Sequence, residues 1–142
     1  MNKNILITGS SQRIGKALCL YFAKKGWNIA IHFNKSKKQA EVLKKEIERY
    51  GVKCVHIQGN LLNAKIIKGL IASVKKKLGN IDCIINNASI FNNDSILNFS
   101  EKSWNEHIKI NLFAPATFIK EFSKIKNLSK NKSIINILDQ RI

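Results

Sequence analysis

Short apolar runs alternate with amphipathic stretches along almost the whole chain, which is typical of strands that alternate with helices. The apolar runs predict five strands, at residues 4–8, 28–33, 53–58, 81–85 and 133–138. Between them, apolar residues recur at spacings of three and four, as on one face of a helix. Because each crossover helix covers one face of a sheet, this alternation predicts parallel strands.

Each predicted helix carries a candidate buried face. The faces are Ile14, Ala17, Leu18, Tyr21 and Phe22 in the first helix, Ala40, Leu43, Ile47 and Tyr50 in the second, Ile67, Leu70, Ile71, Val74 and Leu78 in the third, and Trp104, Ile108, Leu112 and Ile119 in the fourth. Asn63 can cap the third helix, and Ser100 with Glu101 opens the fourth. Pro115 lies inside the fourth helix and is expected to bend it, because it lacks a backbone donor.

The predicted fold class is α/β, a doubly wound, Rossmann-like parallel sheet with the strand order 3-2-1-4-5. In such a sheet the ligand crevice lies at the carboxyl ends of the first and fourth strands, where the winding reverses. No repeat, low-complexity segment or linker interrupts the pattern, so residues 1–142 are predicted to be one domain.

Composition adds a basic surface to this picture. The chain has 142 residues, 44% of them apolar, and a formal net charge of +16. Such a charge can indicate nucleic acid or an anionic membrane as partner. The 22 lysines, however, are spread over every predicted helix, and only three residues are arginine. We therefore predict a solvated basic surface and neither nucleic-acid nor membrane binding.

The cysteines point to a reducing compartment. Cys19, Cys54 and Cys83 fall in predicted helix or strand interiors without Cys-x-x-Cys spacing, so they predict reduced core residues and no metal site. The chain enters its first strand without a charged-then-apolar leader, and no apolar run approaches the length of a membrane span. The expectation is a soluble, cytoplasmic protein.

The candidate chemistry begins at the turn after the first strand, which reads Thr8-Gly9-Ser10-Ser11-Gln12-Arg13-Ile14-Gly15. A strand, a tight turn and a helix place free N–H groups and the positive end of a helix dipole where a phosphate can bind. Gly9 permits the sharp turn, and Gly15 permits close approach of the helix to the sheet. The spacing of the glycines alone is weak, and an ordinary strand-to-helix turn is the alternative.

Three separated motifs together resemble the short-chain dehydrogenase/reductase family. They are Thr-Gly-x3-Arg-Ile-Gly at 8–15, Asn86-Asn87-Ala88-Ser89 after the fourth strand, and Asn111 in the following helix. The resemblance runs from residue 4 to the last residue, but the sequence ends little more than half way through the family's pattern. It implies an oxidoreductase acting on a small molecule, homo-oligomeric in its full-length form, of which these residues are the N-terminal part.

The end of the second strand favours NADP(H) as the cofactor. NAD enzymes usually place an acid there, which binds the ribose 2′-hydroxyl and repels a 2′-phosphate. Here the segment 32–36 has no acid, and Lys35, Ser36 and Arg13 can bind a phosphate. Asn60 replaces the family's usual adenine-binding Asp, and its amide oxygen can still accept a hydrogen bond. The predicted cofactor-binding residues are Thr8, Gly9, Ser11, Arg13, Ile14, Gly15, Asn34, Lys35, Ser36, Asn60, Leu61, Asn87, Ala88 and Ser89.

Several departures from the common family pattern are similar to its pteridine-reductase branch. Arg13 replaces the middle glycine, Ser89 replaces the glycine of Asn-Asn-Ala-Gly, and Asp139 replaces the serine at the end of the fifth strand. The resemblance implies that Phe91 stacks on a pterin and that Asp139 hydrogen-bonds the ring and relays a proton. Arg13, Phe91 and Asp139 are thus predicted to bind substrate. Asn111 and Asp139 are the predicted catalytic residues.

The family's remaining catalytic pair, Tyr-x3-Lys in a helix after the fifth strand, is absent from this sequence. Tyr21 and Lys25 have the spacing but lie in the first helix, and Tyr50 has no lysine four residues on. A loss on the order of 10²–10⁴ in rate is expected for the missing proton transfer alone.

Other functions stay open at this stage. Within the same family, a 3-oxoacyl-thioester reductase is the alternative, although Asp139 and Ser89 disfavour it. A non-catalytic nucleotide-binding relic is the alternative from another class. A basic nucleic-acid-binding protein ranks last.

Overall fold

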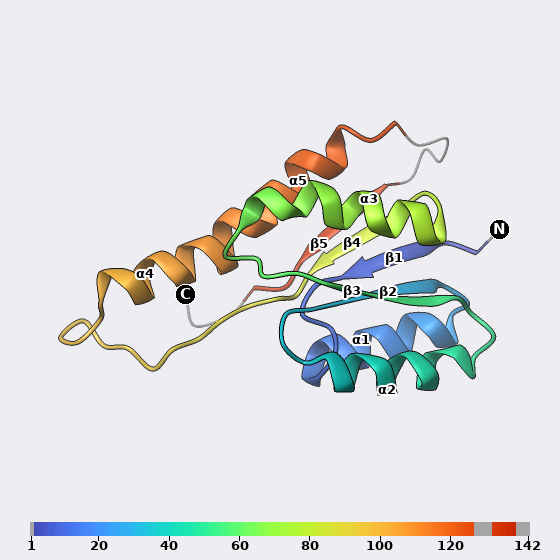
Figure 1. Ribbon diagram of the computed structural model, residues 1–142, viewed down its shortest axis with the longest axis horizontal. Coiled ribbons are helices and arrows are strands. Elements are labelled where there is room, and N and C mark those ends of the chain that lie inside the picture. Colours follow the sequence, from blue (N-terminus) through green and yellow to red (C-terminus); the bar gives the residue numbers. More distant parts are fainter. Residues whose placement is uncertain (1, 127–131, 139–142) are drawn as a thin grey trace.

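The computed structural model describes residues 2–126 and 132–138. Its strands are β1 (Asn4–Ile7), β2 (Asn28–Phe33), β3 (Cys54–Gln58), β4 (Cys83–Asn86) and β5 (Ser133–Asn136). Within the described residues they form one parallel sheet in the order β3-β2-β1-β4-β5 (Figure 1). The predicted order is confirmed; β2 has its predicted bounds, and the ends of the other strands lie within two residues of the predicted ones.

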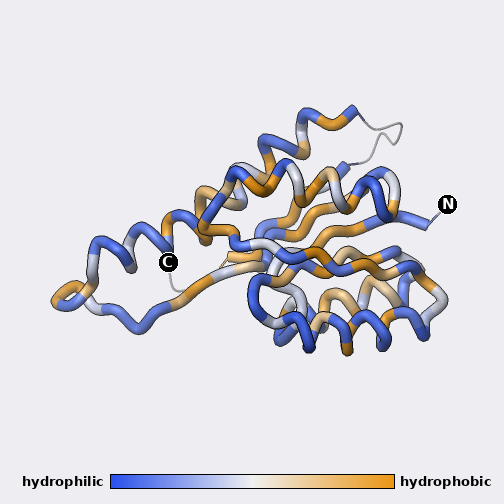
Figure 2. The backbone as a smooth tube through the Cα atoms, in the orientation of Figure 1, coloured by the Kyte–Doolittle hydropathy of each residue, from blue (hydrophilic) through white to orange (hydrophobic). Residues whose placement is uncertain are grey.

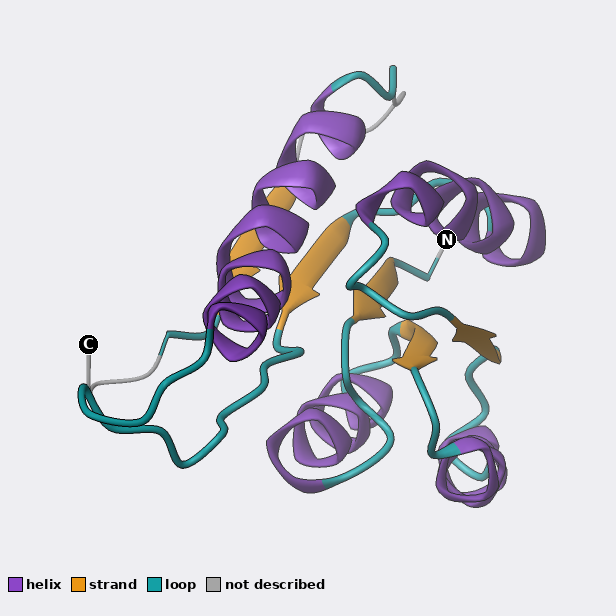
Figure 3. Ribbon diagram, turned by 60° about the vertical axis from the view of Figure 1, so that its left-hand side comes forward, coloured by secondary structure: helices purple, strands orange, loops and turns teal. Residues whose placement is uncertain are grey.

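Helices cover both faces of the sheet (Figures 1 and 3). One face carries α1 (Arg13–Lys24) and α2 (Lys37–Glu48), and the other carries α3 (Ile67–Leu78) and α5 (Ala114–Ser123). A short 3₁₀ turn, η1 (Ala64–Ile66), leads into α3. The helix α4 (Glu101–His107) and a π-helical segment, η2 (Ile108–Phe113), lead into α5.

The two halves of the core follow from the alternation of side chains along each strand. In β1, Ile5 and Ile7 pack with α1 and α2, whereas Leu6 packs with α3 and α5. All three are fully buried, because a parallel sheet with helices on both faces leaves no strand face to water. Figure 2 shows this as apolar residues running along the strands. The three cysteines are buried and free, as predicted.

One of the predicted helix faces is wrong, and that of α1 is right only in part. In α1 the predicted Leu18 and Phe22 pack against the core, but the buried residues are Gly15, Cys19 and Ala23, while Ile14 and Tyr21 are 62% and 56% exposed. The sheet approaches α1 so closely that small residues occupy the contact line, and larger neighbours are displaced to its sides. The faces predicted for α2 and α3 are confirmed within those helices; Tyr50, beyond the end of α2, is exposed.

The last predicted helix carries two apolar stripes, and the prediction chose the wrong one. Trp104, Ile108, Leu112 and Ile119 are all exposed. The sheet side is instead formed by Ala114, Phe118 and Phe122. Both stripes have helical spacing, so periodicity alone does not distinguish them.

Pro115 does not interrupt a regular α-helix. It lies in the first turn of α5, directly after the π-helical segment η2. A proline is tolerated in a first turn, and the wider π turn before it removes the clash of its ring with the fourth preceding carbonyl. The distortion expected at Pro115 therefore lies in the six residues before it.

A buried polar ladder closes the amino edge of the sheet. The Asn4 N–H donates to the Asp82 carboxylate at 2.8 Å, and the Asn28 side-chain amide donates to the Asn4 side-chain oxygen at 2.8 Å. The Lys53 N–H then donates to the side-chain oxygen of Asn28 at 2.9 Å.

No helix among the described residues is long and apolar enough to cross a membrane.

The close packing of α1 predicts contrasting effects of alanine at two glycines. A Cβ on Gly15 would lie 2.5 Å from the Ser10 Cα and 2.7 Å from the Gly9 oxygen, whereas one on Gly69, in α3, meets nothing within 4 Å. Gly15→Ala should lower the free energy of unfolding in urea by about 2 kcal/mol. Gly69→Ala should raise it by about 0.5–1 kcal/mol, as in an open helix. Equal effects of the two changes would contradict this packing.

Candidate functional site

The turns after β1 and β4 lie against each other at the carboxyl edge of the sheet. The hydroxyl of Thr8 accepts the N–H groups of Asn87 and Ala88, both at 2.9 Å. In return, the side-chain amide of Asn87 donates to the carbonyls of Thr8 and Gly9, at 3.0 and 3.1 Å. Four of the predicted site residues are thus brought together. Thr8 itself is buried, so its side chain positions the turns rather than facing a ligand.

Gly9 makes this contact sterically possible. Its φ of +59° lies in the left-handed region, and a Cβ there would be 2.8 Å from the Cα of Ala88. Gly9 and Gly15 thus allow the two turns and the start of α1 to pack in direct contact.

The backbone N–H groups in the first turn of α1 are free to bind a ligand. Gln12, its N-cap residue, makes no side-chain capping bond, and the first described helical bond runs from the Lys16 N–H to the Gln12 carbonyl. The N–H groups of residues 13–15 therefore have no acceptor within the helix. With the helix dipole, they form a place for an anion.

Arg13 stands at the start of α1 with a φ of +51°, the only non-glycine residue with positive φ in the described part of the chain. This conformation suits glycine and costs an arginine about 1 kcal/mol. The sequence had placed Arg13 at the family's middle glycine, and the backbone conformation fits that position. We interpret this conformational cost as tolerated because the guanidinium of Arg13 can bind phosphate oxygens.

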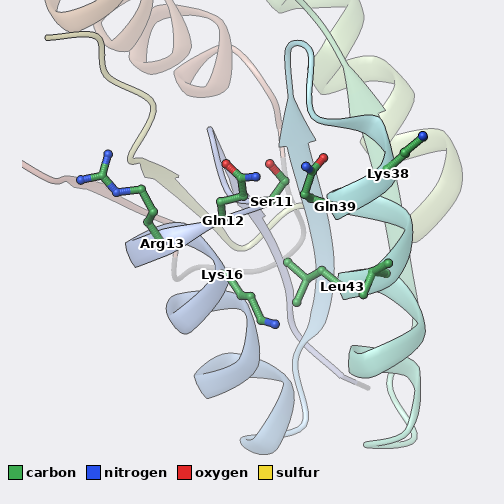
Figure 4. Close-up of a pocket in the computed structure, with 8 residues that line it drawn as sticks. Ser11, Gln12, Arg13, Lys16, Lys38, Gln39 and Leu43 are labelled. Carbon is green, nitrogen blue, oxygen red and sulfur yellow. The ribbon is translucent and has the colours of Figure 1, made fainter.

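A basic cleft of about 400 Å³ lies between the first turns of α1 and α2 (Figure 4). Its lining includes the cations Arg13, Lys16 and Lys38. Arg13 and Lys38 lie at opposite ends of the cleft in Figure 4, and Lys16 forms an ion pair with Glu46 at 2.9 Å.

A hydrogen bond joins Ser11, which lines this cleft, to the loop after β2. The hydroxyl groups of Ser11 and Ser36 are 2.7 Å apart, which joins two predicted cofactor residues. Asn34 and Lys35, in the same loop, are exposed, and the Asn34 carbonyl accepts a hydrogen bond from the Gln58 side chain at 2.8 Å. Of the residues expected to surround a 2′-phosphate, Ser36 thus contacts Ser11, and Lys35 is the exposed residue before it.

The loop after β3 differs from its predicted use. The side-chain oxygen of Asn60 accepts the Leu62 N–H at 3.1 Å, so the atom expected to bind adenine already closes a local turn. Leu61 is 5% exposed and packs with the core on the α3 side. Direct adenine contact by these two side chains stays a prediction.

Asn111 lies in the π-helical segment and holds the loop after β4. Its side-chain oxygen accepts the Ile90 N–H and its amide donates to the Ile90 carbonyl, both at 2.9 Å. Both polar atoms of Asn111 are therefore used to position the segment between Ser89 and Phe91. The catalytic role of Asn111 stays a prediction, and so does stacking by Phe91, which is 75% exposed.

Asp94, Ser103 and His107 lie together beside this loop but do not form a catalytic triad. His107 Nε2 accepts the Asn92 N–H at 3.1 Å, and Nδ1 is 2.8 Å from the Ser103 carbonyl. The Ser103 hydroxyl donates to the Asp94 carboxylate, so it is not oriented toward a base. These hydrogen bonds hold the loop after β4 against α4.

Asp139, the second predicted catalytic residue, lies outside the described residues. The last described part of β5 is nevertheless joined to β4, because the Asn86 side-chain amide donates to the Asn136 side-chain oxygen at 2.8 Å. No group of three or more His, Cys, Asp or Glu residues that could hold a metal occurs in the described part of the chain.

Tyr21 lies far from the carboxyl edge. Because α1 begins at that edge and runs back toward the start of β2, Tyr21 near its end lies toward the amino edge. Its neighbour Lys25 places its ammonium 5.9 Å from the ring centroid. The pair therefore does not replace the absent Tyr-x3-Lys of the family.

His32 is a site residue that the sequence pattern did not identify. It is 2% exposed at the end of β2, and its ring lies between the Gly9 turn and the Gly59 loop. The signal available in the sequence is a single titratable side chain within the apolar run 28–33.

The hydroxyl of Thr8 gives a direct test of the junction between the two turns. Thr8→Val keeps the shape but leaves the N–H groups of Asn87 and Ala88 without their acceptor, so it should lower the free energy of unfolding by about 2 kcal/mol. Thr8→Ser keeps the oxygen, loses one methyl group, and should cost about 1 kcal/mol. Urea unfolding compares the two, and a larger loss for serine than for valine would rule out this account.

Comparison with known proteins agrees with this geometry. Residues 3–139 match the family model described as short chain dehydrogenase. The 3-oxoacyl-[acyl-carrier-protein] reductase FabG of Staphylococcus epidermidis is 31% identical over 137 residues, which are 96% of this chain and 56% of that protein. The 3-oxoacyl-[acyl-carrier-protein] reductase of Synechocystis is 32% identical over 132 residues, 93% of this chain and 53% of that protein.

Solved structures show the same fold. FolM alternative dihydrofolate reductase 1 from Brucella suis, solved in complex with NADP, superposes with a TM-score of 0.91 at 29% identity over 98% of this chain and 58% of that one. The chain thus spans a little over half the length of the relatives it matches, as its resemblance had implied. On the match of residues 3–139, this chain belongs to the short-chain dehydrogenase family.

Proposed function

We propose that this chain binds NADP(H) at the carboxyl edge of its sheet. The observation that carries the proposal is the uncapped first turn of α1, which begins beside the junction of the β1 and β4 turns. A pyrophosphate can bind there, since the N–H groups of residues 13–15 can donate to its oxygens and the helix dipole favours an anion.

Preference for NADP(H) over NAD(H) rests on charge. The loop after β2 has no carboxylate; its Ser36 hydroxyl lies 2.7 Å from that of Ser11, and Lys35 is the exposed residue before it. Ser11 and Arg13 both line the basic cleft. A 2′-phosphate would gain charge-assisted hydrogen bonds from these groups, whereas a free 2′-hydroxyl has no acid to bind it. The related FolM structure with bound NADP supports this choice.

The reaction we propose is reduction of a dihydropterin-type substrate by the reductase to which these residues belong. When bound, NADPH supplies the hydride. The residues of this chain would orient the substrate: Phe91 by stacking, Arg13 by its guanidinium, and Asp139 by hydrogen-bonding the ring and moving a proton. Similarity to FolM, an alternative dihydrofolate reductase, supports this substrate class.

A 3-oxoacyl-thioester reductase is the second candidate. The 31% identity with FabG favours it, while Ser89 and Asp139, which depart from the common family pattern, favour the pteridine substrate. A non-catalytic nucleotide-binding protein is the third candidate, consistent with the lack of Tyr-x3-Lys in this sequence.

Cofactor choice can be tested by titration with NADPH and NADH. The chain should bind NADPH at least about tenfold more tightly, and Lys35→Glu should remove most of that difference by repelling the 2′-phosphate. Lys76→Glu makes the same charge change at the far end of α3, near the amino edge, and should leave the preference intact. Equal affinity of the wild-type chain for both nucleotides would refute the proposal for NADP(H).

Turnover tests the role of the absent Tyr-x3-Lys pair. With NADPH and a dihydropterin, the 142-residue chain should oxidise NADPH about 10²–10⁴ times more slowly than a longer family member that contains the pair. A parallel assay with a 3-oxoacyl thioester separates the two substrate classes. Turnover at ordinary enzyme rates would show that the pair is not needed.

A further inference from the structure

The imidazole of His32 links two loops of the proposed cofactor site. Its Nδ1 lies 3.1 Å from the Gly9 nitrogen, and its Nε2 lies 3.1 Å from the Gly59 carbonyl oxygen. Its own carbonyl accepts the Ser10 N–H at 2.9 Å. Both residues at the top of the β1 turn are therefore held by one residue of the neighbouring strand.

The two ring contacts determine which nitrogen carries the proton. The Gly9 N–H is a donor, so Nδ1 must present its lone pair. The Gly59 carbonyl is an acceptor, so Nε2 must carry the hydrogen. Burial lowers the pKa of His32 to about 4, which keeps the ring in this neutral form near neutral pH.

This arrangement divides the donors of the turn into two groups. The Gly9 N–H is used by His32 and is not available to a phosphate, whereas the N–H groups of residues 13–15 stay open. The hydrogen bond to Nδ1 thereby holds Gly9 in its left-handed conformation, with its Cα against Ala88. Without it, the backbone bond from the Ser10 N–H to the His32 carbonyl still holds the turn to β2, but the Gly9 N–H loses its acceptor.

We propose that His32 is a positioning residue for dinucleotide binding: by accepting the Gly9 N–H, it holds the β1 turn in the shape that receives the pyrophosphate. The Gly59 carbonyl supports this role by selecting the tautomer. The inference rests on the proposed binding of NADP(H). It concerns a side chain that does not itself contact the nucleotide.

Three substitutions test whether the hydrogen-bond acceptor at Nδ1 matters, or only the volume of the His32 ring. His32→Asn places an oxygen where Nδ1 was, His32→Gln keeps a polar group near Nε2 but not the acceptor, and His32→Phe keeps only the ring shape. Measured by NADPH titration per folded molecule, Asn should bind within about threefold of wild type, and Gln and Phe at least about tenfold more weakly. Equal binding by wild type and the folded Gln or Phe variant would overturn the role of His32.

Two measurements on the wild-type chain do not depend on the cofactor. Nitrogen NMR of the His32 ring should show Nδ1 without a proton, and a protonated Nδ1 at neutral pH would overturn the proposal. The folded pKa of about 4 lies below the unfolded value near 6.5, so the unfolded state binds the proton first. The free energy of unfolding should therefore fall as pH drops from 6.5 to 4, and His32→Asn should lack this component.

Different results would contradict NADP(H) binding and the positioning role of His32. Absence of NADPH binding by the wild-type chain overturns the proposed function and the positioning role with it. Wild-type binding together with equal binding by the folded Gln or Phe variant, or with a protonated Nδ1, overturns only the role of His32.

Discussion

The close approach of the β1 and β4 turns is the constraint on which the site depends. One hydroxyl, that of Thr8, accepts two backbone donors of the facing turn, and Asn87 returns two hydrogen bonds. A Cβ on Gly9 or Gly15 would collide with backbone atoms, so only glycine permits this distance. Because both strands end at the same edge, the contacts that join the two turns also position the backbone of the candidate site.

The two edges of the sheet differ in how their polar groups are satisfied. At the amino edge, Asn4, Asn28 and Asp82 pair with backbone groups and with each other, so little is left for a ligand. At the carboxyl edge, the first turn of α1 keeps open donors beside a cleft lined by Arg13, Lys16 and Lys38. The two edges therefore contribute differently: one stabilises the strands, and the other presents unsatisfied groups to an anion.

Much of the site was predictable because its residues belong to short, local patterns. The glycines of the first turn, the Asn87-Ala88 segment and the acid-free loop at Lys35 lie next to strand ends, and parallel strands bring those ends to one edge. The roles within the site were less predictable. The side chain of Asn111 pairs with the Ile90 backbone, and that of Asn60 closes its own turn, because nearby backbone donors compete with a distant ligand.

The sequence by itself determined the order of strands and helices, the parallel sheet and the edge at which the candidate site lies, since these follow from spacing and connection length. Only the tertiary structure decided which of two apolar stripes before and within α5 faces the sheet, that small residues of α1 form its contact line, and that His32 joins two loops. Hydrophobic periodicity indicates only that a helix face can be buried. Whether that face is buried depends on the surfaces that the rest of the chain packs against it.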